Sequence, residues 1–421
     1  MMDWNYEGYP LENVPYFKKN TYWLSPMNFV PEAYDRSRVA KKVLIHDVTL
    51  RDGEQTPDVV FKPDERIKLA VELDYLGADR IEFGMPISSE DVRDSFKEVL
   101  KMDLKAEIIA FLRAHKDDLK LAEELGTRSV LIEHCVNPYV CKHVYGLDHS
   151  QTVERLSEAF RIANANGMKA YFMGWDASRT PIHYLRKLYA DLLDRVKIDA
   201  IVFVDTFGVM TPYGTAYTFK KLKEFFPETN FEIHNHNGFG LGVANALEAI
   251  MNGASCVHTA LCGMGEREGN IAIDEIAATL EILFGIKTGI DLTKVTRISK
   301  LAEKISRYRP AGTKPVTGDF YYMKIIGTAV HAEQKAFQAG LWMGAAFAPK
   351  VIGKTDFEYG LGKGSGMANI RFVLNRLGLE ASEEEMKQML QIVKEESNII
   401  KGTISVTDFE YIARAVMDKK L

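Results

Sequence analysis

The chain has little cysteine, no long apolar run and no concentration of basic residues, and each of these absences excludes a class of protein. Its four cysteines contain no C-x-x-C pair, which is typical of thiols kept reduced in a cytosol and argues against a disulfide framework. No apolar run approaches the roughly 20 residues that a membrane-spanning helix needs. No basic stretch precedes an apolar core at the N-terminus, so no secretory leader is expected. We therefore expect a soluble, cytoplasmic protein with no membrane partner.

The charge balance is mildly acidic and excludes a general nucleic-acid binder. The formal net charge is −5 and the isoelectric point is about 6.1, and no run of lysine or arginine forms a basic stripe. Apolar residues make up 46% of the chain and charged residues 26%, as in an ordinary globular protein. An anionic ligand must therefore be met by cations gathered in a local pocket.

Short apolar runs alternate with longer amphipathic stretches between residues 43 and 290, which is typical of parallel βα units. Candidate helices such as 63–77 and 149–167 lie between the runs and end in glycine. Eight units in about 250 residues predict an α/β fold of the TIM-barrel type, (β/α)₈, and a doubly wound open sheet is the alternative. The eight predicted strands are 43–49, 79–85, 106–112, 128–134, 168–175, 199–206, 230–236 and 256–261.

The two ends of the chain lack this alternation. Residues 1–42 are rich in aromatic residues and proline without a clear period, and they predict an N-terminal arm that either covers its own barrel or clasps a second subunit. Residues 291–421 predict a helical C-terminal appendage, so the catalytic barrel is assigned to 43–290. The helical patterns of the appendage lie near 292–309, 319–339, 366–378, 382–398 and 405–417, with a glycine-rich segment at 360–366.

Polar residues recur where the apolar runs stop. In a barrel the carboxyl ends of all strands open onto one face, where active sites of this fold are built. We therefore expect this face to carry the chemistry. The residues concerned are Arg51, Asp52, Glu82, Arg113, His115, His134, Asp176, Asp205, Thr206, His234 and His236.

His234 and His236 are the best candidates for metal ligands. Residues i and i+2 of a strand point to the same side, so both imidazoles face one space. A carboxylate from the charged segment after the first strand, 46–55, would complete a site for Mg²⁺, Mn²⁺ or Zn²⁺. Arg51 in that segment would stabilise negative charge on a substrate oxygen. A hydrogen-bonded histidine pair and a surface ion pair are the alternatives.

Several of these segments match known signatures. HDVTLRDGEQTP resembles the signature of the 2-isopropylmalate, citramalate and homocitrate synthase family, part of a metallolyase superfamily that includes 3-hydroxy-3-methylglutaryl-CoA lyase. The resemblance spans roughly residues 43 to 420 and implies a divalent metal, acetyl-CoA as co-substrate and a 2-oxo acid acceptor. The matching segments are 46–57, 205–212, 234–254, 263–270 and 361–380.

The resemblance also implies roles for single residues. It implies that the divalent cation is held by Asp52, His234 and His236, with Asn270 close to or completing the shell. Arg51 would bind the keto oxygen of the acceptor and then the alkoxide.

Further roles concern substrate binding and proton transfer. Thr206 resembles the residue that meets the acceptor's carboxylate, and Arg113 is a second candidate for substrate binding. Glu82 is similar to a family acidic residue near the reacting carbons. His331 in GTAVHAE (327–333) resembles the catalytic base that the partner subunit often supplies, which implies a homodimer; an exposed helical histidine is the alternative.

Some departures from the family's pattern bear on the activity. Trp175 stands where many synthases carry a carboxylate, so we expect a reshaped acceptor pocket. Asp52 favours the isopropylmalate and citramalate branch. The loop 263–270 has no cysteine, which disfavours a lyase that cleaves a 3-hydroxyacyl-CoA. That lyase and a non-catalytic metal-binding barrel are the alternatives. The chain ends at Leu421, so feedback inhibition through a C-terminal regulatory domain is not expected.

Overall fold

The computed structural model describes residues 14–33, 40–355 and 358–418. The chain forms two compact units: a barrel unit, Tyr34–Arg309, and a C-terminal unit made of Met1–Ala33 together with Pro310–Leu421. None of the helices in the described part of the chain is long and apolar enough to cross a membrane.

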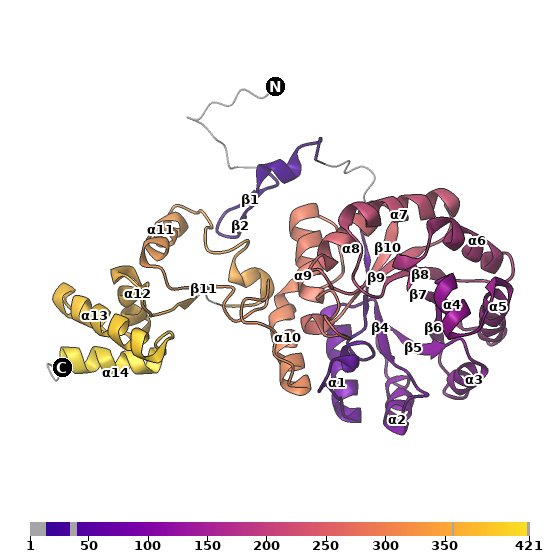
Figure 1. The fold of residues 1–421 in the computed structure, drawn as a ribbon. Helices are drawn as coiled ribbons and strands as arrows, with labels where there is room; N and C mark the ends of the chain where they lie inside the picture. Colours follow the sequence, from indigo (N-terminus) through magenta and orange to yellow (C-terminus); the bar gives the residue numbers. More distant parts are fainter. Residues whose placement is uncertain (1–13, 34–39, 356–357, 419–421) are drawn as a thin grey trace. The chain divides into compact units, whose positions relative to one another are not determined.

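Eight parallel strands close into a barrel, as the sequence predicts, and Figure 1 shows the helices arranged around them. The pairing of Cys256 with Leu44 joins the last strand to the first, which excludes the open sheet. Every predicted apolar run overlaps one strand. The strands are β3 (Leu44–Asp47), β4 (Arg80–Gly84), β5 (Glu107–Arg113), β6 (Ser129–Cys135), β7 (Lys169–Trp175), β8 (Ala200–Asp205), β9 (Phe231–Asn235) and β10 (Ala254–Thr259).

The helices of the barrel unit begin and end at recognisable signals. Ser89 accepts a hydrogen bond from the Val92 amide and caps its helix, and Gly77 ends another helix with φ 105°. A Cβ at Gly77 would lie 2.2 Å from the Gly289 carbonyl oxygen, so this turn requires glycine. The helices are α1 (Pro63–Leu76), α2 (Glu90–Val99), α3 (Lys116–Glu124), α4 (Pro138–Val144), α5 (His149–Ala165), α6 (Ile182–Leu193), α7 (Pro212–Phe225), α8 (Gly242–Met251), α9 (Ile273–Ala278) and α10 (Leu292–Ser306).

Helix α10 packs within the barrel unit. The Arg297 guanidinium forms an ion pair with Glu72 on α1, and the Lys294 ammonium donates to the Tyr75 carbonyl oxygen at 3.0 Å. The compact unit therefore extends to Arg309, beyond the boundary at 290 that the βα rhythm predicts.

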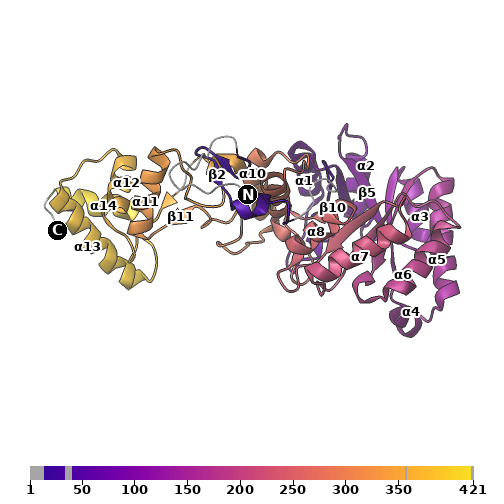
Figure 2. The same cartoon turned by 90° about the horizontal axis from the view of Figure 1, so that it is seen from above.

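The C-terminal unit has a core of its own. Its described residues include the α-helices α11 (Gly327–Gln338), α12 (Met367–Leu377), α13 (Glu383–Ile400) and α14 (Val406–Met417). Figure 2 shows the last three side by side. They pack around buried residues such as Phe409, Met389 and Ile370. The helix predicted over 319–339 begins only at Gly327. The preceding residues form turns and a short strand, β11 (Met323–Lys324), whose backbone pairs with β12 (Glu358–Tyr359).

The described part of the N-terminal arm packs on the C-terminal unit. Its strands β1 (Phe17–Lys18) and β2 (Tyr22–Trp23) form a hairpin, and Tyr22 makes a β-bridge with Phe347. The Ala348 amide donates to the Thr21 carbonyl oxygen at 2.6 Å. The aromatic residues before position 14 that contributed to the predicted arm lie outside the described residues.

Candidate active site

A cavity of about 250 Å³ opens at the carboxyl ends of the barrel strands. Its wall combines charged groups with a cluster of large apolar side chains, so it offers both ion binding and a dry surface for a carbon skeleton. The lining residues are Arg51, Asp52, Gln55, Met85, Phe111, Arg113, Glu133, Met173, Trp175, Val204, Thr206, His234, His236 and Glu266.

A tight turn after β3 aims Arg51 and Asp52 into the cavity. The Val48 carbonyl oxygen accepts hydrogen bonds from the amides of Arg51, Asp52 and Gly53, at 3.1, 2.9 and 3.0 Å. On the neighbouring helix α1, the buried Arg66 guanidinium donates to the Leu50 carbonyl oxygen at 2.6 Å. The backbone that carries the two side chains is therefore fixed from both sides.

Asp52, His234 and His236 converge on one point in the wall of this cavity. The Nε2 atoms of His234 and His236 lie 3.3 and 3.5 Å from Asp52 Oδ2, and all three residues are buried. Their candidate ligand atoms lie within 4.8 Å of one another. The two histidines come from β9 and the turn directly after it, and the aspartate comes from the turn after β3.

The protonation states of the three groups fit a cation. Burial lowers the pKa of both histidines, that of His236 to about 4, so both imidazoles are neutral near pH 7. Burial opposes ionisation of Asp52, but the Arg51 charge and the neighbouring histidines hold its pKa well below the usual range. An ionised carboxylate thus faces two neutral imidazoles, a donor set suited to a divalent metal ion.

Asn270 lies beside this triad. It forms a β-bridge with His236, and its side-chain amide donates to the Met264 carbonyl oxygen at 3.0 Å. Its Oδ1 is buried and accepts no hydrogen bond within the part of the chain that the structure describes, so it is available as a ligand. A Cβ at Gly265 would lie 2.2 Å from the side-chain nitrogen Nδ2 of Asn270, which explains a glycine in this loop.

Glu82 is fully buried behind Arg51 and does not line the cavity. Its carboxylate forms a hydrogen-bonded ion pair with the Arg51 Nε, and its other oxygen lies 3.1 Å from His46 Nε2. The His46 ring stacks on His258 with centroids 4.0 Å apart, and His258 Nε2 lies 3.2 Å from Glu232. This buried network fixes the Arg51 guanidinium, so the structure places Glu82 as a support for the arginine.

The remaining predicted site residues differ in their surroundings. Thr206 lines the cavity, and its hydroxyl accepts a hydrogen bond from the Asp176 amide at 2.9 Å, which leaves the hydroxyl hydrogen for a ligand. Arg113 reaches the rim but pairs with Asp118 at 2.7 Å and is 57% exposed. His331 is exposed on α11 of the C-terminal unit and is not among the residues lining this cavity.

Glu133 lines the cavity and was missed by the sequence reasoning, which chose His134 at the end of the same strand. The two are adjacent on β6, so their side chains point to opposite faces, and His134 Nδ1 lies 2.9 Å from the Cys135 carbonyl oxygen instead. Burial raises the pKa of Glu133 to about 7. Alternation along the apolar run 128–134 is the signal that would have found it.

Large side chains close the cavity on the side of β5, β7 and β8. Trp175 lines it and packs edge-on against Phe207, with centroids 6.0 Å apart. Met173 and Phe111 belong to the hydrophobic core inside the barrel and reach its upper end. These large side chains therefore form an apolar wall of the cavity, and the reshaped acceptor pocket stays a prediction.

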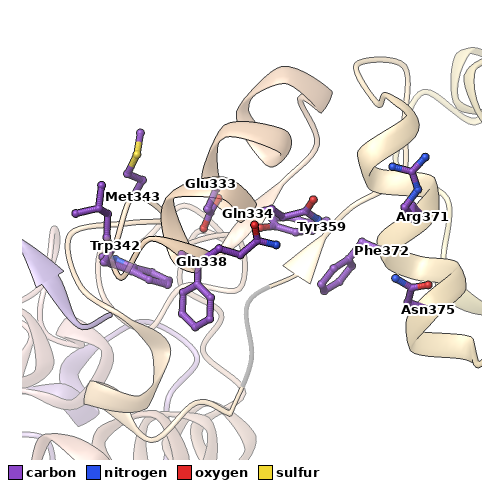
Figure 3. A pocket seen from close by; sticks show the side chains of 11 residues that line it. Glu333, Gln334, Gln338, Trp342, Met343, Tyr359, Arg371, Phe372 and Asn375 are labelled. Atoms are coloured by element: carbon purple, nitrogen blue, oxygen red, sulfur yellow. The ribbon is translucent and has the colours of Figure 1, made fainter. Parts of the chain in front are cut away.

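A second cavity, of about 300 Å³, lies in the C-terminal unit. Figure 3 shows Gln334 and Gln338 on α11 facing Phe372 and Asn375 on α12, with Tyr359 between the two helices. Of the described residues that could hold a metal ion in a group of three, none lines this cavity. The barrel cavity, with its converging ligands, is therefore the candidate active site.

Comparisons with known proteins agree with the barrel and with the synthase signatures. The chain is 33% identical to the 2-isopropylmalate synthase of Methanocaldococcus jannaschii over 87% of its own length and 69% of that protein. It is 31% identical to the homocitrate synthase of Sulfolobus acidocaldarius, covering 86% of this chain and 77% of that one.

Solved structures support the fold. The Bacillus subtilis HMG-CoA lyase superposes with a TM-score of 0.60 at 21% identity, covering 67% of this chain and 99% of that one. The hydroxymethylglutaryl-CoA lyase of Pseudomonas aeruginosa gives a TM-score of 0.58 at 18% identity, and the match covers 65% of this chain and 95% of that one. The profile of the family described as HMGL-like matches residues 42–302, which include the whole barrel and every residue of the converging triad. The chain belongs to the HMGL-like family.

Proposed function

We propose that the protein condenses an acyl-CoA, acetyl-CoA in the simplest case, with a 2-oxo acid to give a 2-hydroxy dicarboxylate and free CoA. The single observation that carries this proposal is the convergence of Asp52, His234 and His236 beside the Arg51 guanidinium. The names of the relatives support it, since they are synthases of 2-isopropylmalate and homocitrate. The profile match over the barrel supports it as well.

The triad and Asn270 would hold a divalent metal ion, Mg²⁺, Mn²⁺ or Zn²⁺. When bound, such an ion supplies Lewis-acid polarisation of the acceptor's ketone. Arg51 donates hydrogen bonds to the same oxygen as it becomes an alkoxide, and the buried Glu82 keeps the guanidinium in place. Thr206 donates its free hydroxyl hydrogen to the acceptor's carboxylate.

The apolar wall determines where the acceptor's carbon skeleton lies. Phe111, Met173 and Trp175 exclude water from the reacting carbons, which strengthens the electrostatic contacts made by Arg51. Arg113 at the rim is a candidate contact for the anionic acyl-CoA. Both substrates are water-soluble, so a cytoplasmic location follows as part of the proposal.

His331 stays a candidate base only in a second arrangement, in which a partner subunit supplies it. A homodimer is thus part of that proposal. Size-exclusion chromatography with light scattering tests it, and a monomer with full activity would exclude the partner-supplied base.

The competing reaction is cleavage of a 3-hydroxyacyl-CoA by the same metal site. Its support is the likeness of the barrel to HMG-CoA lyases, which at about one-fifth identity concerns the fold. The loop from Gly263 to Asn270 contains no cysteine, unlike the loop expected in such lyases. This difference favours condensation.

Release of the CoA thiol decides between these reactions. Purified protein with Mg²⁺ or Mn²⁺ and acetyl-CoA is mixed with pyruvate, 3-methyl-2-oxobutanoate or 2-oxoglutarate, and free thiol is titrated. We expect thiol release that depends on at least one of these acceptors. Cleavage of 3-hydroxy-3-methylglutaryl-CoA without any acceptor-dependent release would instead establish the lyase, and no turnover in either direction would favour a non-catalytic barrel.

A further inference from the structure

Three carboxylates line the barrel cavity, and two of them already have partners. Asp52 faces the two histidines of the triad. Glu266 is half-exposed at the rim and forms an ion pair with Arg267 at 2.6 Å. The third is Glu133, whose carboxylate forms no hydrogen bond or ion pair with any residue in the ranges 14–33, 40–355 and 358–418. Its closest electrostatic influence is the charge of Arg51, which makes no direct contact with it, so the carboxylate in the cavity wall is available for a substrate.

The strands on both sides fix the position of Glu133. It lies on β6, in register with Arg113 of β5 and Met173 of β7, and its carbonyl oxygen accepts from the Ala114 amide at 3.1 Å. All three of these paired side chains line the same cavity. Pairing on both sides fixes the backbone of Glu133, and its carboxylate lines the cavity that also contains Arg51 and the triad.

The surroundings of Glu133 suit proton transfer near pH 7. Phe111, Met173 and Trp175 give the cavity an apolar wall, and burial raises the pKa of the Glu133 carboxyl to about 7. A general base works best when its pKa lies close to the working pH. The geometry and the protonation equilibrium thus point to the same role.

We propose that Glu133 is the catalytic base that removes a proton from the methyl group of the acyl thioester. This assignment rests on the proposed condensation. It also gives a role to the Glu133 carboxylate in a cavity in which position 175 is occupied by tryptophan.

The step balances in atoms and electrons. The Glu133 carboxylate takes one proton from the methyl carbon, and the pair of electrons of the broken C–H bond forms the enolate of the thioester. The enolate carbon then bonds to the ketone carbon of the 2-oxo acid, and the ketone π electrons move to the oxygen held by Arg51. That alkoxide takes up a proton from water, and the Glu133 carboxyl returns its proton to the hydroxide so formed, which restores the carboxylate. A second water then hydrolyses the thioester to release the CoA thiol and a carboxylate.

The other candidate bases fit less well. Glu82 is fully buried, bonded to Arg51 and His46, and outside the cavity wall. His331 is exposed on α11 and does not line the cavity, so its proposed role needs a partner subunit to supply it. Glu133 is therefore the carboxylate of the barrel unit that lines the cavity and is still free to accept a proton.

Two variants of the whole protein test the assignment. Glu133→Gln keeps the shape of the side chain and removes its basicity, and Glu133→Asp keeps the basicity and withdraws it by one methylene. Glu123→Gln, the same change on the exposed surface of α3, is the matched control. Each protein is assayed with Mg²⁺, acetyl-CoA and whichever of the three acceptors above the wild type uses fastest.

Loss of a general base is expected to lower kcat of Glu133→Gln by about 10²–10⁴-fold. Bound metal content and acceptor affinity measured by calorimetry should stay within a factor of about three of the wild type. In Glu133→Asp, trideuterated acetyl-CoA should react more slowly than ordinary acetyl-CoA by a larger factor than in the wild type, because proton removal then limits the rate. An unchanged isotope effect there would overturn the assignment even if Glu133→Gln did not fold.

Each other result also decides the question. Full activity in Glu133→Gln, or loss of metal or acceptor binding together with activity, would overturn the base assignment and leave the condensing activity of the wild type in place. A wild-type protein that releases no CoA thiol with any acceptor would overturn the proposed function, and the assignment with it. The two failures are therefore distinguishable.

Discussion

The barrel cavity and the cavity between α11 and α12 are similar in volume and differ in how their walls are built. The barrel cavity collects side chains from several strands of a closed sheet, and the Arg51 guanidinium in its wall is paired with Glu82 behind it. The cavity between α11 and α12 is lined largely by aromatic and long polar side chains from a few consecutive elements. Volume alone thus does not identify a site, because chemistry needs groups from distant parts of the sequence held at fixed distances.

The comparison also concerns stability. In the barrel unit the interior carries ion pairs such as Arg51 with Glu82, because burial of an isolated ion is very costly. The C-terminal unit instead buries an apolar cluster that includes Phe409, Ile370 and Met389. A change in one unit should therefore leave the other largely unaffected, and the following predictions test this separation.

The largest effect is expected from Asp52→Ala. The variant should lose acceptor-dependent CoA release and bind the metal at least about 100-fold more weakly. Loss of a residue that only hydrogen-bonds to a metal ligand already costs up to about 100-fold, and Asp52 is itself a proposed ligand. Metal content after dialysis and the thiol assay measure the two effects. The comparison is Glu333→Gln, which changes a carboxylate in the α11–α12 cavity. This variant should keep the metal ion of the barrel cavity, and loss of that ion would break the distinction between the cavities.

The next effect concerns the stability of the C-terminal unit. Phe409→Ala removes a fully buried ring from its core and should cost about 3–5 kcal/mol. Hydrogen exchange should become faster in α12, α13 and α14 while the barrel strands stay protected and the metal stays bound. Equal deprotection of the barrel strands would show that the two units unfold as one.

A smaller change is expected from Trp175→Ala, which enlarges the acceptor side of the cavity. The ratio of kcat/KM between a larger and a smaller 2-oxo acid should shift toward the larger by about 10-fold or more, as for one or two methylenes in an apolar pocket. Competition between pyruvate and 3-methyl-2-oxobutanoate measures this ratio. An unchanged ratio would mean that Trp175 does not contact the acceptor.

The smallest effect is a pH dependence of stability. Burial raises the pKa of Glu133 from 4.5 to about 7, so the folded state binds this proton more tightly than the unfolded chain does. The resulting stabilisation is complete below about pH 4.5 and is lost as the pH rises through 7. Glu133→Gln should therefore gain stability over the wild type between pH 5 and 8.

The gain should appear as a few degrees in Tm, since 1 kcal/mol shifts the midpoint by roughly 2–4 °C in a domain of this size. Melting curves of wild type, Glu133→Gln and the control Glu123→Gln across this pH range measure it. A difference that does not change with pH would mean that Glu133 titrates as it would in water.

Local pattern was sufficient for most of the fold and for part of the site. The apolar runs predicted all eight strands because a strand buried on both faces must be almost wholly apolar. The i, i+2 spacing placed His234 and His236 on one side. The pattern failed at two places. It chose His134 instead of the adjacent Glu133 as the residue that faces the cavity, and it extended a helix back to 319 over residues that form turns and the strand β11.

The sequence by itself determined the barrel, the facing histidine pair and the apolar character of the wall that includes Trp175, since these depend on the order of side chains along each strand. Only the tertiary structure decided which charges meet. It brought the turn after β3 next to β9, buried Glu82 behind Arg51, and left the Glu133 carboxylate in the cavity without a hydrogen bond from any described residue. The physical reason is closure of the barrel, because contacts between residues some 180 positions apart depend on how the strands tilt and pair around the ring.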